Sequence, residues 1–487
     1  MIWCVLEFVR RNLKFVLWVA AAALCLRLLI VYKLPQVAGD SLPYDDIAKN
    51  LLNHGTYGLT SPEGINPTLA RLPGYPFFLA LVFAIFGQDH FRAVMLVQAV
   101  IDIGTCLLVC DIARRTMSEA AARVAFLIAA LCPFVANYAA TPLTEVPSIF
   151  FLTLAIRNAV LAFDDPRARN WIYCGAAIAA AILLRPDSGL ILGSIGLVVL
   201  FRFYRYPAQR KKLLAGGLLI AVVALAPLVP WAIRNWRVMH VFQPLVNMEA
   251  TDPGDFIARG WGYWVRTWVA DYSNIEDICF HVDGEPVDIN LVPARAFDSP
   301  QEREYVAQLF AEYNDNSNTT TPELDHKLLV LAQQKIHRHL FRYYVGLPVL
   351  RLLDMWFRPR TAMLPFDVHW WTFRTNPWNT VGCALIALLN LMLVGAAVVG
   401  IFRGEPVRYM ALLLVFPAVR CIFLMAIGTA EDRYTLECFP CVYLLASRWL
   451  ATLAAGRSGT SHLASLANVE NGTPSYIDSG GSGVSGG

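Results

Sequence analysis

Three carboxylates lie close together in the stretch VAGDSLPYDDIAKNLLNHG, residues 37–55, which follows the first long apolar segment of the chain. They are Asp40, Asp45 and Asp46. An aspartate at a helix start can act as an N-cap, because its side chain accepts hydrogen bonds from free backbone amides, and Pro43 favours such a start. A carboxylate can also act as a general base that accepts the proton of an attacking hydroxyl. The residue types alone leave both interpretations open.

Further ionisable residues stand at the ends of later apolar segments. A charged side chain inside a membrane costs roughly 2.5–3.5 kcal/mol on insertion scales, so the grouping of such residues is informative. Acids and arginines that meet at one membrane boundary would suit an anionic, lipid-borne substrate. Each could also have an ordinary role, as a first-turn carboxylate that favours the helix dipole or as an interfacial anchor. The residues are Arg71, Glu145, Arg185, Asp187, Arg234, Glu431 and Arg433.

The composition indicates the class of protein to which the chain belongs. Of the 487 residues, 56% are hydrophobic and 16% are charged. This is too apolar for an ordinary soluble protein and predicts a multi-pass membrane protein. We expect no nucleic-acid partner. The sequence has no Gly-rich phosphate loop, no HExxH zinc motif and no GxSxG nucleophile motif.

Apolar runs and basic residues together predict about ten transmembrane helices. Nine runs are long enough to cross, whereas 74–87 and 171–185 are ambiguous by length. Basic residues accumulate on the cytoplasmic side, and the basic turns all fall there if 171–185 crosses and 74–87 lies along the outer surface. Both termini are then cytoplasmic. The expected spans are 15–33, 92–113, 119–138, 143–163, 171–185, 188–204, 212–231, 380–402, 407–428 and 435–454.

This topology divides the chain into transmembrane modules, an outer domain and a tail. The outer domain is rich in Trp and Tyr, and its last part has the composition of interfacial helices. The tail is rich in Gly and Ser, which is typical of disorder. The predicted parts are an N-terminal module 1–231 with a first outer loop 34–91, an outer domain 232–379 ending in interfacial helices 337–360, C-terminal transmembrane helices 380–455, and a disordered cytoplasmic tail 456–487.

The first outer loop resembles a known family. The stretches GDSLPYDDIAKNLLNHGTYG and RLPGYPFFLALVFAIFG resemble the corresponding loop of GT-C membrane glycosyltransferases, in the branch of lipid A aminoarabinose transferases and protein O-mannosyltransferases. Many relatives have two prolines directly after the basic residue, whereas here Leu72 precedes Pro73. The outer region 240–335 matches no part of the family that we can place. The matching residues are Asp40, Tyr44, Asp46, Ile47, Ala48, Arg71, Pro73, Phe86 and Gly87, supported by the stretches 143–156, 183–190, 230–238 and 431–440.

The resemblance implies a fold and an activity. The fold is an all-α polytopic GT-C fold with about ten transmembrane helices, interfacial helices in the first outer loop and a mostly helical outer domain. The activity is transfer of a hexosyl or pentosyl group, with inversion, from an undecaprenyl-phosphate-type donor. It takes place on the periplasmic face of a bacterial inner membrane. The acceptor could be a lipid, a glycan or a protein, and membrane lipids are the remaining expected partners.

The resemblance also implies roles for the matching residues. Asp40 would be the general base, with Asp46 as a supporting acid, Asp45 as a solvated neighbour and Glu145 orienting the acceptor. The lipid phosphate and the donor would be bound by Arg71, Arg185, Arg433, Tyr44 and Arg234. Asp40, Asp46 and Glu145 could instead hold a divalent cation. An arginine set can neutralise one phosphate by itself, so we expect no required metal or other cofactor.

Two other functions remain open at the level of the sequence. A transporter or flippase for lipid-linked saccharides would also place arginines and carboxylates near lipid headgroups. The sequence disfavours it, because the charged residues collect at one face and no internal repeat is visible. A non-catalytic assembly factor with a large outer domain is the third possibility.

Overall fold

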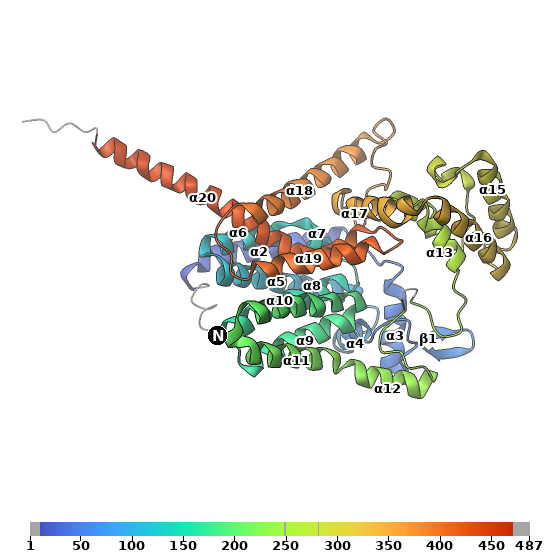
Figure 1. The fold of residues 1–487 in the computed structure, drawn as a ribbon, viewed down its shortest axis with the longest axis horizontal. Helices are drawn as coiled ribbons and strands as arrows, with labels where there is room; N and C mark the ends of the chain where they lie inside the picture. Colours follow the sequence, from blue (N-terminus) through green and yellow to red (C-terminus); the bar gives the residue numbers. More distant parts are fainter. Residues whose placement is uncertain (1–9, 248–249, 281, 471–487) are drawn as a thin grey trace, which may run out of the picture.

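The computed structural model describes residues 10–247, 250–280 and 282–470, and it is a helical bundle with a smaller helical domain at one end. Figure 1 shows the bundle helices side by side along the long axis of the molecule. The bundle consists of α2 (Leu13–Lys33), α5 (Phe91–Thr116), α6 (Glu119–Leu131), α7 (Pro133–Tyr138), α8 (Glu145–Asp164), α9 (Ala168–Leu184), α10 (Leu190–Arg205), α11 (Arg210–Leu225), α12 (Leu228–Met239), α18 (Pro377–Phe402), α19 (Met410–Met425) and α20 (Phe439–Glu470).

The predicted all-α membrane architecture is confirmed. Each of the ten expected spans falls on one or two of these helices. Within the described residues, six helices are long and apolar enough to cross a membrane, and three shorter helices are also apolar. The six are Leu13–Lys33, Phe91–Thr116, Glu145–Asp164, Pro186–Arg205, Pro207–Met239 and Pro377–Phe402, and the shorter ones are Gly74–Phe86, Ala168–Leu184 and Met410–Met425.

Two boundaries differ from those expected. The run 119–138 is divided into α6 and α7, because Pro133 starts a new helix and cannot continue the preceding one. Helix α20 extends to Glu470, so residues 456–470 are helical and not disordered as expected. Their Ala and Leu residues favour a helix. The rest of the predicted tail, 471–487, lies outside the described residues.

The first outer loop consists of helix α3 (Ser41–His54), an antiparallel hairpin of β1 (Gly58–Ser61) and β2 (Gly64–Pro67), and helix α4 (Gly74–Phe86). Helix α4 buries Tyr75, Leu79 and Phe83 and exposes Leu81 on its other face. Its start lies against the end of α9, where a side chain on Gly74 would come within 2.5 Å of the carbonyl oxygen of Leu183. This close approach holds the loop on the bundle.

The outer domain is mostly helical, as predicted, and has its own core. The core surrounds Trp264 and Trp268 and continues into Leu424, in the last turn of the bundle helix α19, and Ala430, which follows this helix. The domain therefore packs on the bundle end that carries the first outer loop (Figure 1). Its elements are α13 (Arg259–Arg266), α14 (Tyr272–Asn274), η3 (Ile275–Cys279), η4 (Ile289–Leu291), η5 (Ala294–Ala296), α15 (Pro300–Asp315), α16 (Pro322–Arg338), η6 (Arg342–Gly346) and α17 (Leu347–Phe357).

A buried ion pair joins three helices inside the bundle. Arg27 of α2 is fully buried, and its Nε donates to Oδ2 of Asp102 on α5 at 2.9 Å. Its Nη1 donates to the carbonyl oxygen of Ala130 on α6 at 2.7 Å. Removal of one partner of such a pair leaves an uncompensated charge in a medium of low dielectric constant. Arg27 should therefore contribute strongly to the stability of the bundle.

We expect Arg27→Leu to lower the free energy of unfolding by about 3–5 kcal/mol, because it leaves Asp102 charged and unpaired. Thermal unfolding in detergent measures this as a lowered midpoint temperature. The double variant Arg27→Leu/Asp102→Leu should recover much of the loss, since it removes both charges. The matched control is Arg169→Leu, at an exposed arginine. Equal midpoints for Arg27→Leu and this control would contradict the role of the ion pair.

Candidate functional site

A cavity of about 760 Å³ lies at the end of the bundle, where residues of the first outer loop form part of its wall, and it is next to the outer domain. One part of its wall is polar and comes from the loop before α3, the start of α8, the turn between α9 and α10, and the 3-10 helix η7 (Asp432–Cys438). The other part is apolar and comes from α10, α11, α12 and α19. Its lining residues there include Leu190, Leu192, Leu225, Leu228 and Phe423.

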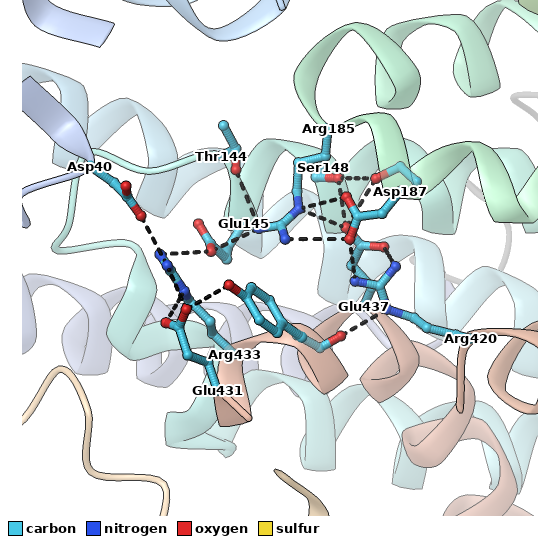
Figure 2. A network of polar contacts seen from close by, with 12 residues as sticks. Asp40, Thr144, Glu145, Ser148, Arg185, Asp187, Arg420, Glu431, Arg433 and Glu437 are labelled. Carbon is cyan, nitrogen blue, oxygen red and sulfur yellow. Dashed lines mark hydrogen bonds and ion pairs between the residues drawn. The ribbon is translucent and has the colours of Figure 1, made fainter. Parts of the chain in front are cut away.

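Asp40 faces the polar part of the cavity (Figure 2). It stands at the N-cap position of α3, but its side chain makes no capping hydrogen bond. Its Oδ2 instead accepts a hydrogen bond from Nη2 of Arg433 at 2.9 Å, and its Oδ1 lies 3.7 Å from Nη2 of Arg71. The carboxylate is 45% exposed. The capping interpretation of Asp40 is therefore wrong, and its carboxylate belongs to the cavity.

The charge state of Asp40 is set by two opposing effects. Partial burial raises the pKa of its carboxyl group, but the guanidinium groups of Arg433, Arg71 and Arg185 outweigh this effect and hold the pKa below its usual value. Asp40 is therefore ionised at neutral pH and able to accept a proton or a cationic partner.

Glu145 opens helix α8 and is almost completely buried, with 3% of its side chain exposed. Its Oε1 accepts a hydrogen bond from Nη1 of Arg185 at 2.9 Å and lies 3.7 Å from Nη1 of Arg433. Among the described residues, none donates a hydrogen bond to its Oε2. Glu145 lines the cavity, and a carboxylate oxygen without a partner can accept a hydrogen bond from a bound hydroxyl.

A second layer of charge lies behind Arg185. Arg420 of α19 is fully buried, and its Nη2 donates to Oδ2 of Asp187 at 2.9 Å. Its Nη1 lies 2.6 Å from Oε2 of Glu437. Nε of Arg185 lies 3.2 Å from Asp187 and 3.4 Å from Glu437. Hydroxyls of Ser148 and Ser188 complete the network by donating to Oε1 of Glu437 (Figure 2).

The arginines of this network differ in how far their charge is compensated. Arg185 contacts three carboxylates, those of Glu145, Asp187 and Glu437. Arg433 contacts Glu431 at 2.6 Å in addition to Asp40 and Glu145. Arg71 has one carboxylate partner among the described residues, at the longer distance of 3.7 Å. Arg71 therefore has the most charge left for an anionic ligand.

Six of the predicted site residues meet at the cavity, and two do not. Asp46 lies outside it and binds the hairpin, because its Oδ2 accepts from the backbone amide of Thr60 at 2.6 Å. Arg234 donates to the carbonyl oxygens of Tyr57 and Thr68 and holds the chain that leads to Arg71. The six are Asp40, Tyr44, Arg71, Glu145, Arg185 and Arg433.

The remaining acid of the opening stretch also differs from expectation. Asp45 is buried, with 8% of the residue exposed, and its Oδ2 accepts a hydrogen bond from Nζ of Lys49 at 2.7 Å. Burial accordingly raises the pKa of Asp45. The expectation of a solvated neighbour is wrong.

The three carboxylates proposed to share a divalent cation do not converge. Asp40 and Glu145 both face Arg433, whereas Asp46 binds Thr60. Within the part of the chain that the structure describes, no group of three or more His, Cys, Asp or Glu side chains is arranged to hold a metal ion. Such a cation, if required, would need ligands other than this triad.

Arg420 and Glu437 were missed by the sequence analysis. Arg420 is the one charged residue within a long apolar run, MALLLVFPAVRCIFLM. A charged residue inside such a run is by itself a signal of a functional or structural ion pair. Glu437 follows Arg433 by four residues, and no sequence pattern predicts that η7 turns it toward α19.

Comparison with known proteins supports the resemblance. Residues 67–231 match the sequence profile of the dolichyl-phosphate-mannose-protein mannosyltransferase family, whereas no curated protein matches the chain. The oligosaccharyltransferase AglB of Archaeoglobus fulgidus, solved with an inhibitory peptide and a dolichol-phosphate, is similar in structure with a TM-score of 0.51 and 14% identity. The similarity covers 96% of this chain and 52% of AglB, so the chain spans about half the length of that protein.

A second similar structure is ArnT of Cupriavidus metallidurans bound to undecaprenyl phosphate, with a TM-score of 0.42 and 14% identity over 91% of this chain and 79% of ArnT. The structural similarity to AglB extends over nearly the whole chain and shows a common fold. The profile match lies in the part of the chain that contains Arg71, Glu145 and Arg185. The chain is thus a multi-pass membrane protein with the fold of GT-C glycosyltransferases, and residues 67–231 carry the sequence pattern of their mannosyltransferase branch.

Proposed function

We propose that the protein is a glycosyltransferase that moves a sugar, with inversion, from a polyprenyl-phosphate carrier to an acceptor. The observation that carries this proposal is the ionised carboxylate of Asp40 beside Arg71 and Arg433 at the polar end of a cavity whose other end is apolar. A carrier lipid has the same division into a charged head and an apolar chain. The transfer takes place on the periplasmic face of a bacterial inner membrane.

The donor class is supported by both the cavity and the relatives. The apolar wall formed by Leu190, Leu192, Leu225 and Leu228 suits a prenyl chain, because burial of apolar surface stabilises binding by roughly 25 cal/mol per Å². The family name includes dolichyl-phosphate-mannose, and the AglB structure contains a dolichol-phosphate. The donor phosphate would lie between Arg71 and Arg433.

Asp40 acts as the general base in this proposal. The acceptor oxygen attacks the anomeric carbon and passes its proton to the Asp40 carboxylate, while the bond from that carbon to the phosphate oxygen breaks. The electron pair of this bond stays on the lipid phosphate. A positioned base contributes roughly 10²–10⁴ in rate. The free Oε2 of Glu145 accepts a hydrogen bond from a hydroxyl of the acceptor and orients it.

Arg71 and Arg433 stabilise the negative charge that develops on the leaving phosphate. A phosphate bound to Arg433 competes with Asp40 for the same guanidinium group. Binding of the donor therefore weakens the ion pair of Asp40 and raises the pKa of this base. Arg185, enclosed by three carboxylates, holds Glu145 in place.

We expect Asp40→Asn to lower kcat by about 10²–10⁴, because the amide cannot accept the acceptor proton. The assay follows release of the carrier phosphate from synthetic polyprenyl-phosphate sugars by purified protein in lipid nanodiscs. Asp46→Asn is the matched control, since Asp46 lies in the same loop outside the cavity, and it should keep near-normal kcat. Normal turnover by a well-folded Asp40→Asn protein would overturn the proposed base. Carrier movement across the bilayer without any sugar release would favour a flippase instead.

The pH dependence of kcat/KM tests the electrostatic environment of Asp40. In the free protein its pKa is lowered by Arg433 and Arg71, so activity should persist to a lower pH than an ordinary carboxyl group would allow. Arg433→Gln removes the largest favourable interaction, and the acidic limb of the profile should move to higher pH. This limb reports the free protein. An unchanged acidic limb in the Arg433→Gln protein would show that Asp40 is not the titrating group.

A further inference from the structure

The hairpin between α10 and α11 carries a concentration of cations that have no carboxylate partner among the described residues. It contains Arg202, Arg205, Arg210, Lys211 and Lys212, and the chain has no Asp or Glu between residues 188 and 248. The last four of these side chains are exposed. Helix α10 starts at the cavity and its 16 residues extend over about 24 Å. The hairpin therefore lies at the opposite end of the bundle from the cavity (Figure 1).

Several other arginines at this end of the bundle are paired with acids. Arg114, Arg115 and Arg157 all contact the carboxylate of Asp111, at 2.8–2.9 Å. Asp164, which directly follows Phe163 in α8, is occupied by Arg408 and Tyr409. The orientation of membrane proteins explains why basic residues collect at this end. It does not explain why the hairpin lacks the acids that accompany the neighbouring turns.

The arginines of the hairpin are held by aromatic rings. The guanidinium carbon of Arg202 lies 4.8 Å from the ring centre of Phe163 and 5.0 Å from those of Tyr206 and Tyr409. Its Nε is buried and has no hydrogen-bond acceptor among the described residues. The rings fix the cation in place but cannot accept a strong hydrogen bond. A donor of this kind is suited to an anionic oxygen from outside the chain.

Exposed rings on the same hairpin indicate the environment of that anion. Phe201 and Tyr204 are 62% and 68% exposed, and they belong to the last turns of a helix that is long and apolar enough to cross a membrane. Aromatic residues at such positions lie at the level of lipid headgroups. Clusters of four or more Lys and Arg next to a membrane span bind anionic headgroups.

We infer that the α10–α11 hairpin is a binding site for the headgroup of an anionic membrane phospholipid. The phosphodiester accepts hydrogen bonds from Arg202 and from the neighbouring exposed cations. This site lies apart from the cavity, so its occupancy does not depend on the proposed transferase activity. The bound lipid fixes the depth of α10 and α11 in the bilayer.

Native mass spectrometry of the detergent-solubilised full chain tests this site, with phosphatidylglycerol and phosphatidylcholine of identical acyl chains as probes. The test variant is Arg205→Gln/Arg210→Gln/Lys211→Gln/Lys212→Gln. The matched control, Arg123→Gln/Arg167→Gln/Arg169→Gln/Arg403→Gln, removes the same number of exposed cations at the same end of the bundle. Each cation near a lipid surface contributes about fivefold to binding, so the test variant should bind phosphatidylglycerol more than tenfold less tightly.

Wild-type protein and the control variant should retain a preference for phosphatidylglycerol over phosphatidylcholine that the test variant has lost. Lysine-only replacement, Lys211→Gln/Lys212→Gln, gives a second variant with a smaller change to the fold, and it should show a partial loss. Equal binding of phosphatidylglycerol by the wild-type protein and the test variant would overturn the inference. So would an equal loss in the control variant. Displacement of the lipid by soluble polyphosphate at equal charge would show that the partner is a soluble anion.

Discussion

The candidate site depends on the compensation of buried charge at the end of a membrane bundle. Removal of an ionised group from water costs several kcal/mol unless opposite charges and hydrogen bonds replace the lost hydration. Here the carboxylates outnumber the arginines by one. The acids are Asp40, Glu145, Asp187, Glu431 and Glu437, and the arginines are Arg71, Arg185, Arg420 and Arg433. The geometry of the polar cavity wall follows from how these carboxylates and guanidinium groups pair with one another.

This constraint links segments that are far apart in the chain. Arg420 in α19 holds Asp187 after α9, and both meet Glu437 in η7. Asp187 and Glu437 share Arg420, and Nη1 of Arg185 remains available to Glu145 on the cavity side. The fully buried layer thus positions the partly exposed one. The outer domain supports the same region, since its core includes Leu424 and Ala430 on either side of the turn that leads to η7.

Much of the fold was predictable from the sequence, because membrane spans are long apolar runs and basic residues orient them. The limits of the apolar runs also predicted that Glu145, Arg185 and Arg433 lie at the ends of spans. In the structure these three residues meet at the cavity. The sequence could not separate Asp40 from Asp45 and Asp46 by environment, since Asp40 immediately precedes the short helix that contains the other two, and the packing of this helix decides which of them faces the cavity. Arg234 was misassigned to the site because an arginine at a span end binds phosphate or backbone carbonyls equally well. Arg420 carried a usable signal, an isolated charge in an apolar run, whereas the position of Glu437 depends on tertiary packing.

The most direct test of the central claim is a cryo-electron microscopy structure of the Asp40→Asn protein with a polyprenyl-phosphate sugar bound. The account predicts the phosphate within hydrogen-bond distance of Arg71 and Arg433, the prenyl chain along α10, α11 and α12, and the anomeric carbon facing residue 40. A donor phosphate bound away from Arg71 and Arg433, or an anomeric carbon turned away from residue 40, would contradict it.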